Sequence, residues 1–188
     1  MTDSNINKME GSTLIKVITD AAVEKTSGKY KGRAGVLILD GDGIVRHFYS
    51  EGLGNVTSNE GEYQALKLGV TLATAETASK KDADLELYTD SKLVFNQMLG
   101  NYRTKKAEFV TMQKSIKGIC RPFKSTKMKW HRRNSDLAVL ADFASKHPRR
   151  TRTIANFSVG KHVSVVIDKV ANFLLKDEAK AEEEKKHG

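Results

Sequence analysis

The chain has 188 residues, of which 39% are hydrophobic and 29% charged, so it is long enough for one domain with an ordinary buried core. A single cysteine, Cys120, excludes an internal disulfide framework, and the lack of a membrane-length apolar run or a signal-peptide core predicts a cytoplasmic protein. The net charge is +9, and residues 103–152 hold 15 Lys and Arg against three acids, which favours a polyanionic partner, with nucleic acid the first candidate.

The first half of the chain predicts a three-stranded meander followed by a helix. Residues 1–12 are polar and are expected to form a disordered leader. The glycines of Asp40-Gly41-Asp42-Gly43, which lie between two apolar runs, suit a hairpin turn. Leu66, Val70 and Ala73 recur at helical spacing. The predicted elements are a strand at 13–19, a loop at 21–32, strands at 34–39 and 44–50, and a helix at 59–79.

The second half predicts alternating strands and helices: a strand at 84–89, helices at 91–99 and 105–119, a short strand ending at 130, and a helix at 135–146. The whole order, β-β-β-α-β-α-α-β-α, predicts an α/β fold with a mixed five-stranded sheet flanked by helices on both faces. This domain would span residues 13–148. Residues 149–188 are expected to be a basic, helical extension with a charged tail, and a helix at 163–175 offers an apolar face for a homodimer.

Three carboxylates occupy positions that this fold would bring together. Asp20 and Asp90 each end a predicted strand, and Glu62 lies one turn into the helix that starts near Asn59. In open α/β sheets the functional site lies beyond the carboxyl ends of the parallel strands. Acids that converge there cannot all stay charged without a cation between them. The pattern predicts a hard-metal site, and such a site in a basic chain indicates phosphodiester chemistry.

Three sequence blocks resemble those of a known family. They are Ile-Thr-Asp20-Ala-Ala, Thr57-Ser-Asn-Glu-Gly-Glu62-Tyr-Gln-Ala-Leu66 and Tyr88-Thr-Asp90-Ser-Lys-Leu-Val-Phe-Asn-Gln97. In this order and on these elements, they resemble type 1 ribonuclease H, and the similarity covers residues 14–147. The resemblance therefore implies a ribonuclease H-like fold.

The resemblance also implies a function. Asp20, Glu62 and Asp90 would hold two Mg²⁺ ions, or Mn²⁺ as a substitute, and the enzyme would cut the RNA strand of RNA–DNA hybrids. Thr57, Ser58 and Asn59 match family positions that contact the substrate backbone, where they can read the ribose 2′-OH. The same three residues are also plausible caps for the helix that follows, and both roles can hold at once.

The chain departs from the family in its last helix. The run from Asn134 to Ala144 matches the family pattern, but the position of the fourth carboxylate is Ala138. Two acids are candidates to replace it. Asp142 lies one turn further on and shares the face of Ala138, while Asp136 is two residues earlier. Asp136 is equally suited to a structural role at the helix N-terminus.

Further residues complete the expected site. His131 falls near a family His or Arg that assists product departure, and it is a candidate for general acid catalysis. A structural or RNA-contacting role is the alternative for His131. The expected grip on the hybrid comes from one of two sets of basic residues: Lys124, Lys127, Lys129, Arg132 and Arg133, or Arg149, Arg150 and Arg152. Two alternatives to the ribonuclease remain: a binding protein silenced by Ala138, and another nuclease of this fold, such as a junction resolvase.

Overall fold

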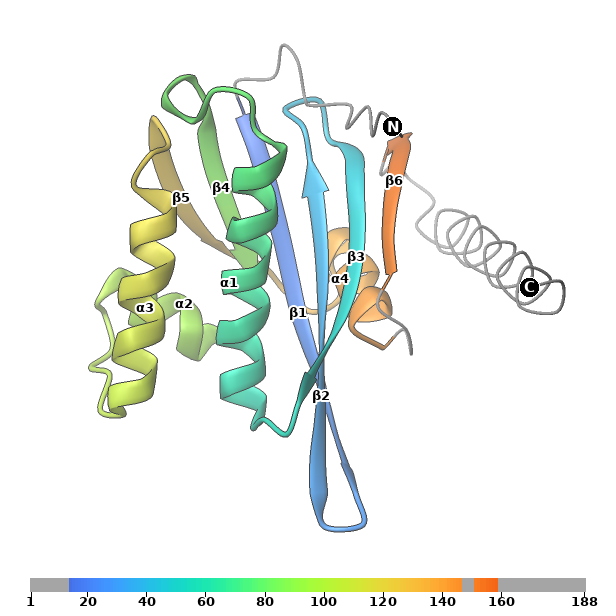
Figure 1. The fold of residues 1–188 in the computed structure, drawn as a ribbon, viewed down its shortest axis with the longest axis vertical. Helices are drawn as coiled ribbons and strands as arrows, with labels where there is room; N and C mark the ends of the chain where they lie inside the picture. The colour runs from blue at the N-terminus through green and yellow to red at the C-terminus, as the bar shows by residue number, and fades with distance from the viewer. Residues whose placement is uncertain (1–13, 147–150, 159–188) are drawn as a thin grey trace, which may run out of the picture.

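The computed structural model describes residues 14–146 and 151–158 (Figure 1). The elements are, in chain order, β1 (Leu14–Thr26), β2 (Lys29–Leu39), β3 (Ile44–Gly54), α1 (Ser58–Glu76), the short 3₁₀ helix η1 (Lys80–Asp82), β4 (Asp84–Thr89), α2 (Lys92–Leu99), α3 (Ala107–Cys120), β5 (Ser125–Trp130), α4 (Asp136–Lys146) and β6 (Thr151–Ser158). The expected leader at 1–12 and the helix at 163–175, with its dimer face, lie outside the described residues. Across the described part, every helix is too short or too polar to span a bilayer.

The predicted mixed sheet is confirmed. The strand order is β5-β4-β1-β2-β3-β6, with β1, β4 and β5 parallel and the other neighbours antiparallel. Thr19 of β1 pairs with Thr89 of β4. The next residues, Asp20 and Asp90, therefore lie where the parallel pairing of β1 and β4 ends, although β1 itself continues to Thr26. The ends of parallel strands are where catalytic groups come together in open α/β sheets.

Helices cover both faces of the sheet, as the element order predicted. Figure 1 shows α1 and α3 in front of the sheet and α4 behind it. Neighbouring residues of β1 face opposite sides: Val17 belongs to the core cluster of α1 and α3, whereas Ile18 belongs to the cluster of α4. The central strands are therefore buried on both faces and form a rigid base for the edge that carries the acids.

The predicted loop at 21–32 is wrong. β1 continues to Thr26 and β2 begins at Lys29, so these residues form a long hairpin closed by Ser27 and Gly28. Both turn residues have positive φ, 51° and 79°, as a two-residue type I′ turn requires. Most residues on both strands of this hairpin are solvent-exposed beyond Val23, so the sequence shows polar composition instead of the alternation of a half-buried strand.

A sixth strand extends the predicted five-stranded sheet. β6 pairs antiparallel with β3, from Ile44 opposite Ser158 to Ser50 opposite Thr151. It lies within the region that the sequence analysis assigned to a C-terminal extension. A short, weakly apolar run is compatible with a strand, a loop or part of a helix, so only the tertiary partner β3 decides its conformation.

Gly35 lets α4 lie directly on β2. A Cβ built at this position would lie 2.3 Å from the carbonyl oxygen of Ala141 and 2.4 Å from the backbone nitrogen of Ser145. Because both of those atoms are helix backbone, no side-chain rotation can relieve the clash. Gly35 therefore sets the distance between α4 and the strand edge that carries Asp20, its partner across β1 and β2.

We expect Gly35→Ala to lower the free energy of unfolding by about 2 kcal/mol or more, because α4 must move away from the sheet. Gly52→Ala is the matched control, since a Cβ at Gly52 of β3 meets nothing within 4 Å. It should change stability by less than about 0.5 kcal/mol. Urea denaturation of the two variants measures both effects, and equal stabilities would contradict the close packing at Gly35.

Candidate metal and nucleic-acid site

Asp20, Glu62 and Asp90 converge as the sequence predicted. Asp20 comes from β1 and Asp90 follows β4, while Glu62 projects from the first turns of α1. One carboxylate oxygen of each residue lies within 4.8 Å of the others, and these three form the one such acid cluster found among the described residues. Three carboxylates at these distances make a set of hard oxygen ligands.

Burial makes this cluster electrostatically unfavourable without a cation. Glu62 is 7% exposed, and burial, followed by the charges of Asp20 and Asp90, raises the pKa of its carboxyl well above the usual range. Burial also raises the pKa of Asp20, against the effect of a hydrogen bond from Ser145. Within the described residues, Glu62 Oε2 and Asp90 Oδ1 are buried without a hydrogen-bond partner. Buried, unpartnered carboxylate oxygens in such a cluster fit a divalent cation.

Two cations partly balance the acids. Arg133 Nε lies 2.8 Å from Asp90 Oδ2, although the Arg133 side chain is 84% exposed. Lys146 Nζ lies 2.7 Å from Asp142 Oδ2, one turn away on α4. Both partners reach the acids from solvent, so a metal ion can replace either cation at the carboxylates, and a phosphate can draw either cation away, with little desolvation.

Two acids of this cluster, Asp20 and Asp90, line a cavity of about 380 Å³, whereas Glu62 is not among its lining residues. The lining comes from β1, the residues after β4 and β5, and α4: Asp20, Ala21, Ala22, Val23, Glu24, Asp90, Arg133, Ala138, Asp142 and Lys146. Ala138 and Asp142 line the same cavity from successive turns of α4. The charge of Asp142 contributes to the raised pKa of Asp20, after burial and Asp90.

The two candidates for the missing fourth carboxylate therefore differ in position. Asp142 faces the cavity that holds Asp20 and Asp90, although its oxygens lie outside the 4.8 Å cluster. Asp136 is exposed in the first turn of α4 and is not among the described residues that line the cavity. The geometry therefore favours Asp142, and Asp136 occupies the position of an ordinary acid at a helix N-terminus.

His131 lies beside the cluster, one residue past the end of β5. Its Nδ1 lies 2.9 Å from Ser135 Oγ, and its ring meets the edge of Tyr88. Burial lowers the pKa of His131, with the charge of Asp90 acting in the opposite direction. The ring is therefore mainly neutral near pH 7, so a proton donor role requires a change in its surroundings.

The residues expected to contact substrate are exposed. Thr57 caps α1: its backbone N–H donates to Glu60 Oε2 at 2.6 Å, and its hydroxyl accepts from the Glu60 backbone N–H at 3.4 Å. Ser58 and Asn59 follow it in the exposed first turn. Among the basic residues, Lys127 and Arg132 are exposed, and Lys129 pairs with Glu86 at 3.4 Å. Thr57 therefore caps α1, and its side chain is still exposed to solvent, where it could contact a substrate.

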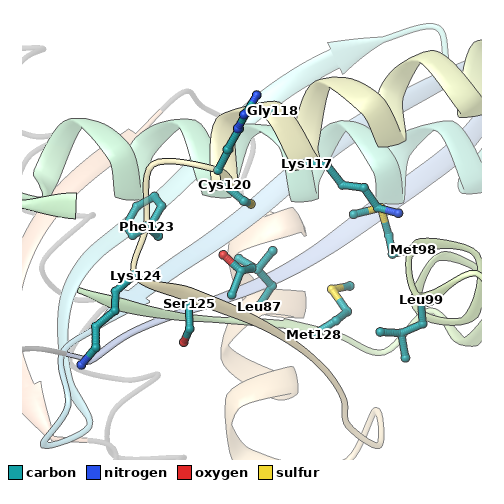
Figure 2. Close-up of a pocket in the computed structure, with 12 residues that line it drawn as sticks. Leu87, Met98, Leu99, Lys117, Gly118, Cys120, Phe123, Lys124, Ser125 and Met128 are labelled. Carbon is teal, nitrogen blue, oxygen red and sulfur yellow. The ribbon is translucent and has the colours of Figure 1, made fainter. Parts of the chain in front are cut away.

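A second cavity, of about 620 Å³, differs in chemistry (Figure 2). It lies between α2, α3 and β5, and Figure 2 shows Met98, Met128 and Leu87 around it. No carboxylate among the described residues lines it, and burial raises the pKa of the Cys120 thiol at its wall to about 11. It therefore lacks the carboxylate oxygens found at the acid cluster, and its thiol stays protonated near neutral pH.

Comparison with known proteins fits this geometry. The family described as reverse transcriptase-like matches residues 19–147, from β1 to the end of α4. The chain belongs to this family. Its fold is that of type 1 ribonuclease H, as the sequence blocks predicted. Among curated proteins, none matches the sequence.

Several solved structures share the fold. RNase H1 from the halophilic archaeon Halobacterium salinarum is 22% identical, with a TM-score of 0.61, and the match covers 70% of this chain and 94% of that one. The RNase H domain of a Mycobacterium tuberculosis protein is 22% identical, with a TM-score of 0.59 and coverage of 70% and 91%. LC11-RNase H1, solved with an RNA/DNA hybrid, is 25% identical, with a TM-score of 0.59 and coverage of 70% and 96%.

Sequence reasoning missed Ser145 and the ion pair of Arg133. The Ser145 hydroxyl is fully buried, donates to Asp20 Oδ2 at 2.7 Å and lies 2.8 Å from the Asp142 carbonyl oxygen. It thereby ties the last turn of α4 to β1. These partners are 125 and 43 residues apart along the chain, so no local pattern points to them. Ser145 is a polar residue near the end of an apolar helix face, and that position is the one available signal.

We expect Glu62→Gln to raise the melting temperature of the metal-free protein at pH 7 by a few degrees, or on the order of 1 kcal/mol. The folded pKa of Glu62 lies above the ordinary 4.5, so the ionised carboxylate destabilises the fold at neutral pH. This cost disappears as the pH falls through the folded pKa, and the gain from the substitution should shrink with it.

Glu60→Gln, in the exposed capping box of the same helix, is the control, and it should leave the melting temperature unchanged or lower it. Thermal melts of the three proteins in EDTA give the comparison. A Glu62→Gln protein that is less stable than the parent at pH 7 would show that Glu62 is not an electrostatic burden.

Proposed function

We propose that this protein is a metal-dependent endonuclease that hydrolyses the RNA strand of RNA–DNA hybrids. The observation that carries the proposal is the convergence of one buried and two half-buried carboxylates, two of them with unpartnered oxygens, at the strand edge of a ribonuclease H fold. The presence of an RNA/DNA hybrid in the LC11-RNase H1 structure supports the choice of substrate. The basic block at residues 103–152 supports a polyanionic substrate in general.

Asp20, Glu62 and Asp90 would hold two divalent ions, Mg²⁺ or Mn²⁺, because hard cations prefer carboxylate oxygens. When bound, such a pair lowers the pKa of an attacking water and stabilises the leaving oxygen of the phosphodiester. Ser145 keeps the Asp20 carboxylate oriented by a hydrogen bond to one oxygen, which leaves the other oxygen available as a ligand.

The remaining residues would position the substrate. Arg133, released from Asp90, is placed to contact a phosphate at the cavity. Thr57, Ser58 and Asn59 would contact the RNA backbone at the N-terminus of α1, where the helix dipole favours a phosphate. Lys127, Lys129 and Arg132 would add contacts to the sugar–phosphate backbone. His131 remains a proposed proton-transfer residue, and its lowered pKa means that it starts as a proton acceptor.

Cleavage of labelled duplexes tests the function. Incubated with hybrid, duplex RNA and duplex DNA, in Mg²⁺ and in Mn²⁺, the protein should cut the RNA of the hybrid and spare both homoduplexes. Asp90→Asn should reduce the rate by at least about 100-fold, because it removes a ligand charge at the centre of the cluster. A melting curve in EDTA checks that this variant is folded.

Other outcomes of this assay favour the alternatives. Salt-sensitive binding of hybrid with no cleavage in either metal would replace the enzyme by a binding protein of the same fold. Cleavage of duplex DNA or of branched DNA in place of hybrid would indicate a different nuclease, such as a junction resolvase.

We propose further that Asp142 supplies the fourth carboxylate in place of Ala138. Asp142→Asn should lower hybrid cleavage by about 10- to 100-fold, the range typical of outer metal-site residues. Asp136→Asn is the matched control, because Asp136 lies on the same helix but outside the cavity, and it should leave the rate unchanged. Steady-state rates at saturating and limiting Mn²⁺ measure both.

If the missing carboxylate at position 138 limits the rate of hybrid cleavage, Ala138→Asp should raise that rate. Unchanged turnover in Asp142→Asn would remove this residue from the site. A loss in Asp136→Asn as large as in Asp142→Asn would assign both effects to the charge of α4 instead of to metal binding.

A further inference from the structure

The first hairpin extends the sheet beyond the carboxylates. β1 runs six residues past Asp20 to Thr26, and β2 returns from Lys29. β1 pairs with β4 only as far as Thr19, and β2 pairs with β3 only from Gly32, so the hairpin tip has no other strand beside it. Figure 1 shows it projecting past the start of α1. We call residues 21–33 the arm, and six residues at about 3.3 Å each give it a reach of about 20 Å beyond Asp20.

The arm is basic and carries an exposed aromatic ring. It holds four cations, Lys25, Lys29, Lys31 and Arg33, against one acid, Glu24. In the described structure Lys25, Lys29 and Lys31 are exposed and form no ion pair with an acid. Tyr30 is 43% exposed, with Lys25 Nζ 5.7 Å from its ring centroid. No packing of the domain requires this composition, since a two-stranded ribbon gains little from exposed lysines.

The arm and the carboxylate cavity are continuous. Ala21, Ala22, Val23 and Glu24 of the arm line the same cavity as Asp20, Asp90 and Asp142. One wall of the cavity is therefore the strand that leads to the basic tip. A polymeric substrate that is held at the carboxylates and follows this wall would lie beside the cations of the arm, at a distance from the reacting phosphate.

The β2 side of the arm is held against the segment that precedes α1, from near the tip at Tyr30 to Gly32. The Tyr30 backbone N–H donates to Asn55 Oδ1 at 3.2 Å, and Val56 packs where Gly32 has no side chain, since a Cβ there would lie 2.2 Å from Val56 Cγ2. Asn55 and Val56 directly precede Thr57, which caps α1. The arm is thus connected to the helix N-terminus that is proposed to contact the RNA backbone, and the two surfaces are adjacent.

We propose that the arm is a second nucleic-acid contact, which binds the sugar–phosphate backbone of the duplex about six base pairs from the cut phosphate. The position of the cut phosphate in this inference rests on the proposed function. Binding of the duplex by the arm can be measured without cleavage. The distance follows from the reach of about 20 Å and a duplex rise of about 3.4 Å per base pair. Lysines supply the charge, and Tyr30 offers a surface for stacking on a sugar or an end base.

Binding to hybrids of two lengths tests the proposal. Fluorescence anisotropy in EDTA, where no cleavage interferes, measures the Kd of the full chain for an 18-base-pair and a 6-base-pair hybrid. The longer hybrid can span the distance of about six base pairs between the carboxylates and the arm, whereas the shorter one is too short to occupy both. The triple variant Lys25→Gln, Lys29→Gln, Lys31→Gln should raise the Kd for the long hybrid about 10-fold or more near 0.1 M salt. Its log–log salt dependence should become shallower by about 2 to 3, about one for each lost phosphate contact.

A second triple variant gives the matched control. Lys67→Gln, Lys80→Gln and Lys81→Gln remove the same charge from α1 and η1, outside the basic block at residues 103–152. This variant should change the Kd for either hybrid by less than about 2-fold, since these sites lie away from the arm. Tyr30→Ser should weaken binding of the long hybrid by about 5-fold without changing the salt dependence.

The outcomes separate this proposal from the function it extends. Equal effects of the two triple variants, or an equal loss on both hybrid lengths, would overturn the role of the arm. A loss specific to the arm and to the long hybrid supports it even where the parent protein fails to cut any hybrid, a result that would count against the enzyme alone. Melting curves of each variant check that the substitutions leave the fold intact.

Discussion

The repulsion among Asp20, Glu62 and Asp90 is the constraint on which the rest of this structure depends. Arg133 and Ser145 relieve it only in part, because Glu62 is buried and the described residues offer no partner to Glu62 Oε2 or Asp90 Oδ1. Packing elsewhere in the fold must therefore offset the destabilisation that this repulsion causes. It does so through central strands that are buried on both faces and through a helix, α4, that lies against Gly35 without an intervening side chain.

The basic character of the chain follows from the same constraint. Arg133 and Lys146 neutralise part of the acidic charge from solvent, with exposed side chains that can leave when a better cation arrives. A permanently buried counter-ion would stabilise the empty site and oppose metal binding. Exposed cations near the cavity can instead transfer from a carboxylate to a phosphate, so the same residues can serve the free protein and the complex.

The sequence was sufficient to predict the three acids of the site, but not the residues that contact them. Asp20 and Asp90 could be predicted because each follows an apolar run, although β1 continues past Asp20, and Glu62 because a capped helix start fixes its turn. Ser145 and the pairing of Arg133 with Asp90 could not, because they depend on contacts between distant segments. The hairpin tip could not be predicted because strands that are exposed on both faces show no apolar periodicity. The strand β6 could not be predicted because only its pairing with β3 defines its conformation.

Ala138 and the arm are connected by the geometry of α4. Moving a carboxylate from position 138 to position 142 displaces it by one turn, about 6 Å along the helix axis. A displacement of that size exceeds the reach of an Asp side chain, so the ligand set would be extended toward the last turn of α4. That turn is fixed to β1 by the Ser145 hydroxyl, and the cavity continues from Asp142 along Ala21 to Glu24 into the arm. A site extended in this direction would draw the substrate along β1, which is the path on which the basic tip lies.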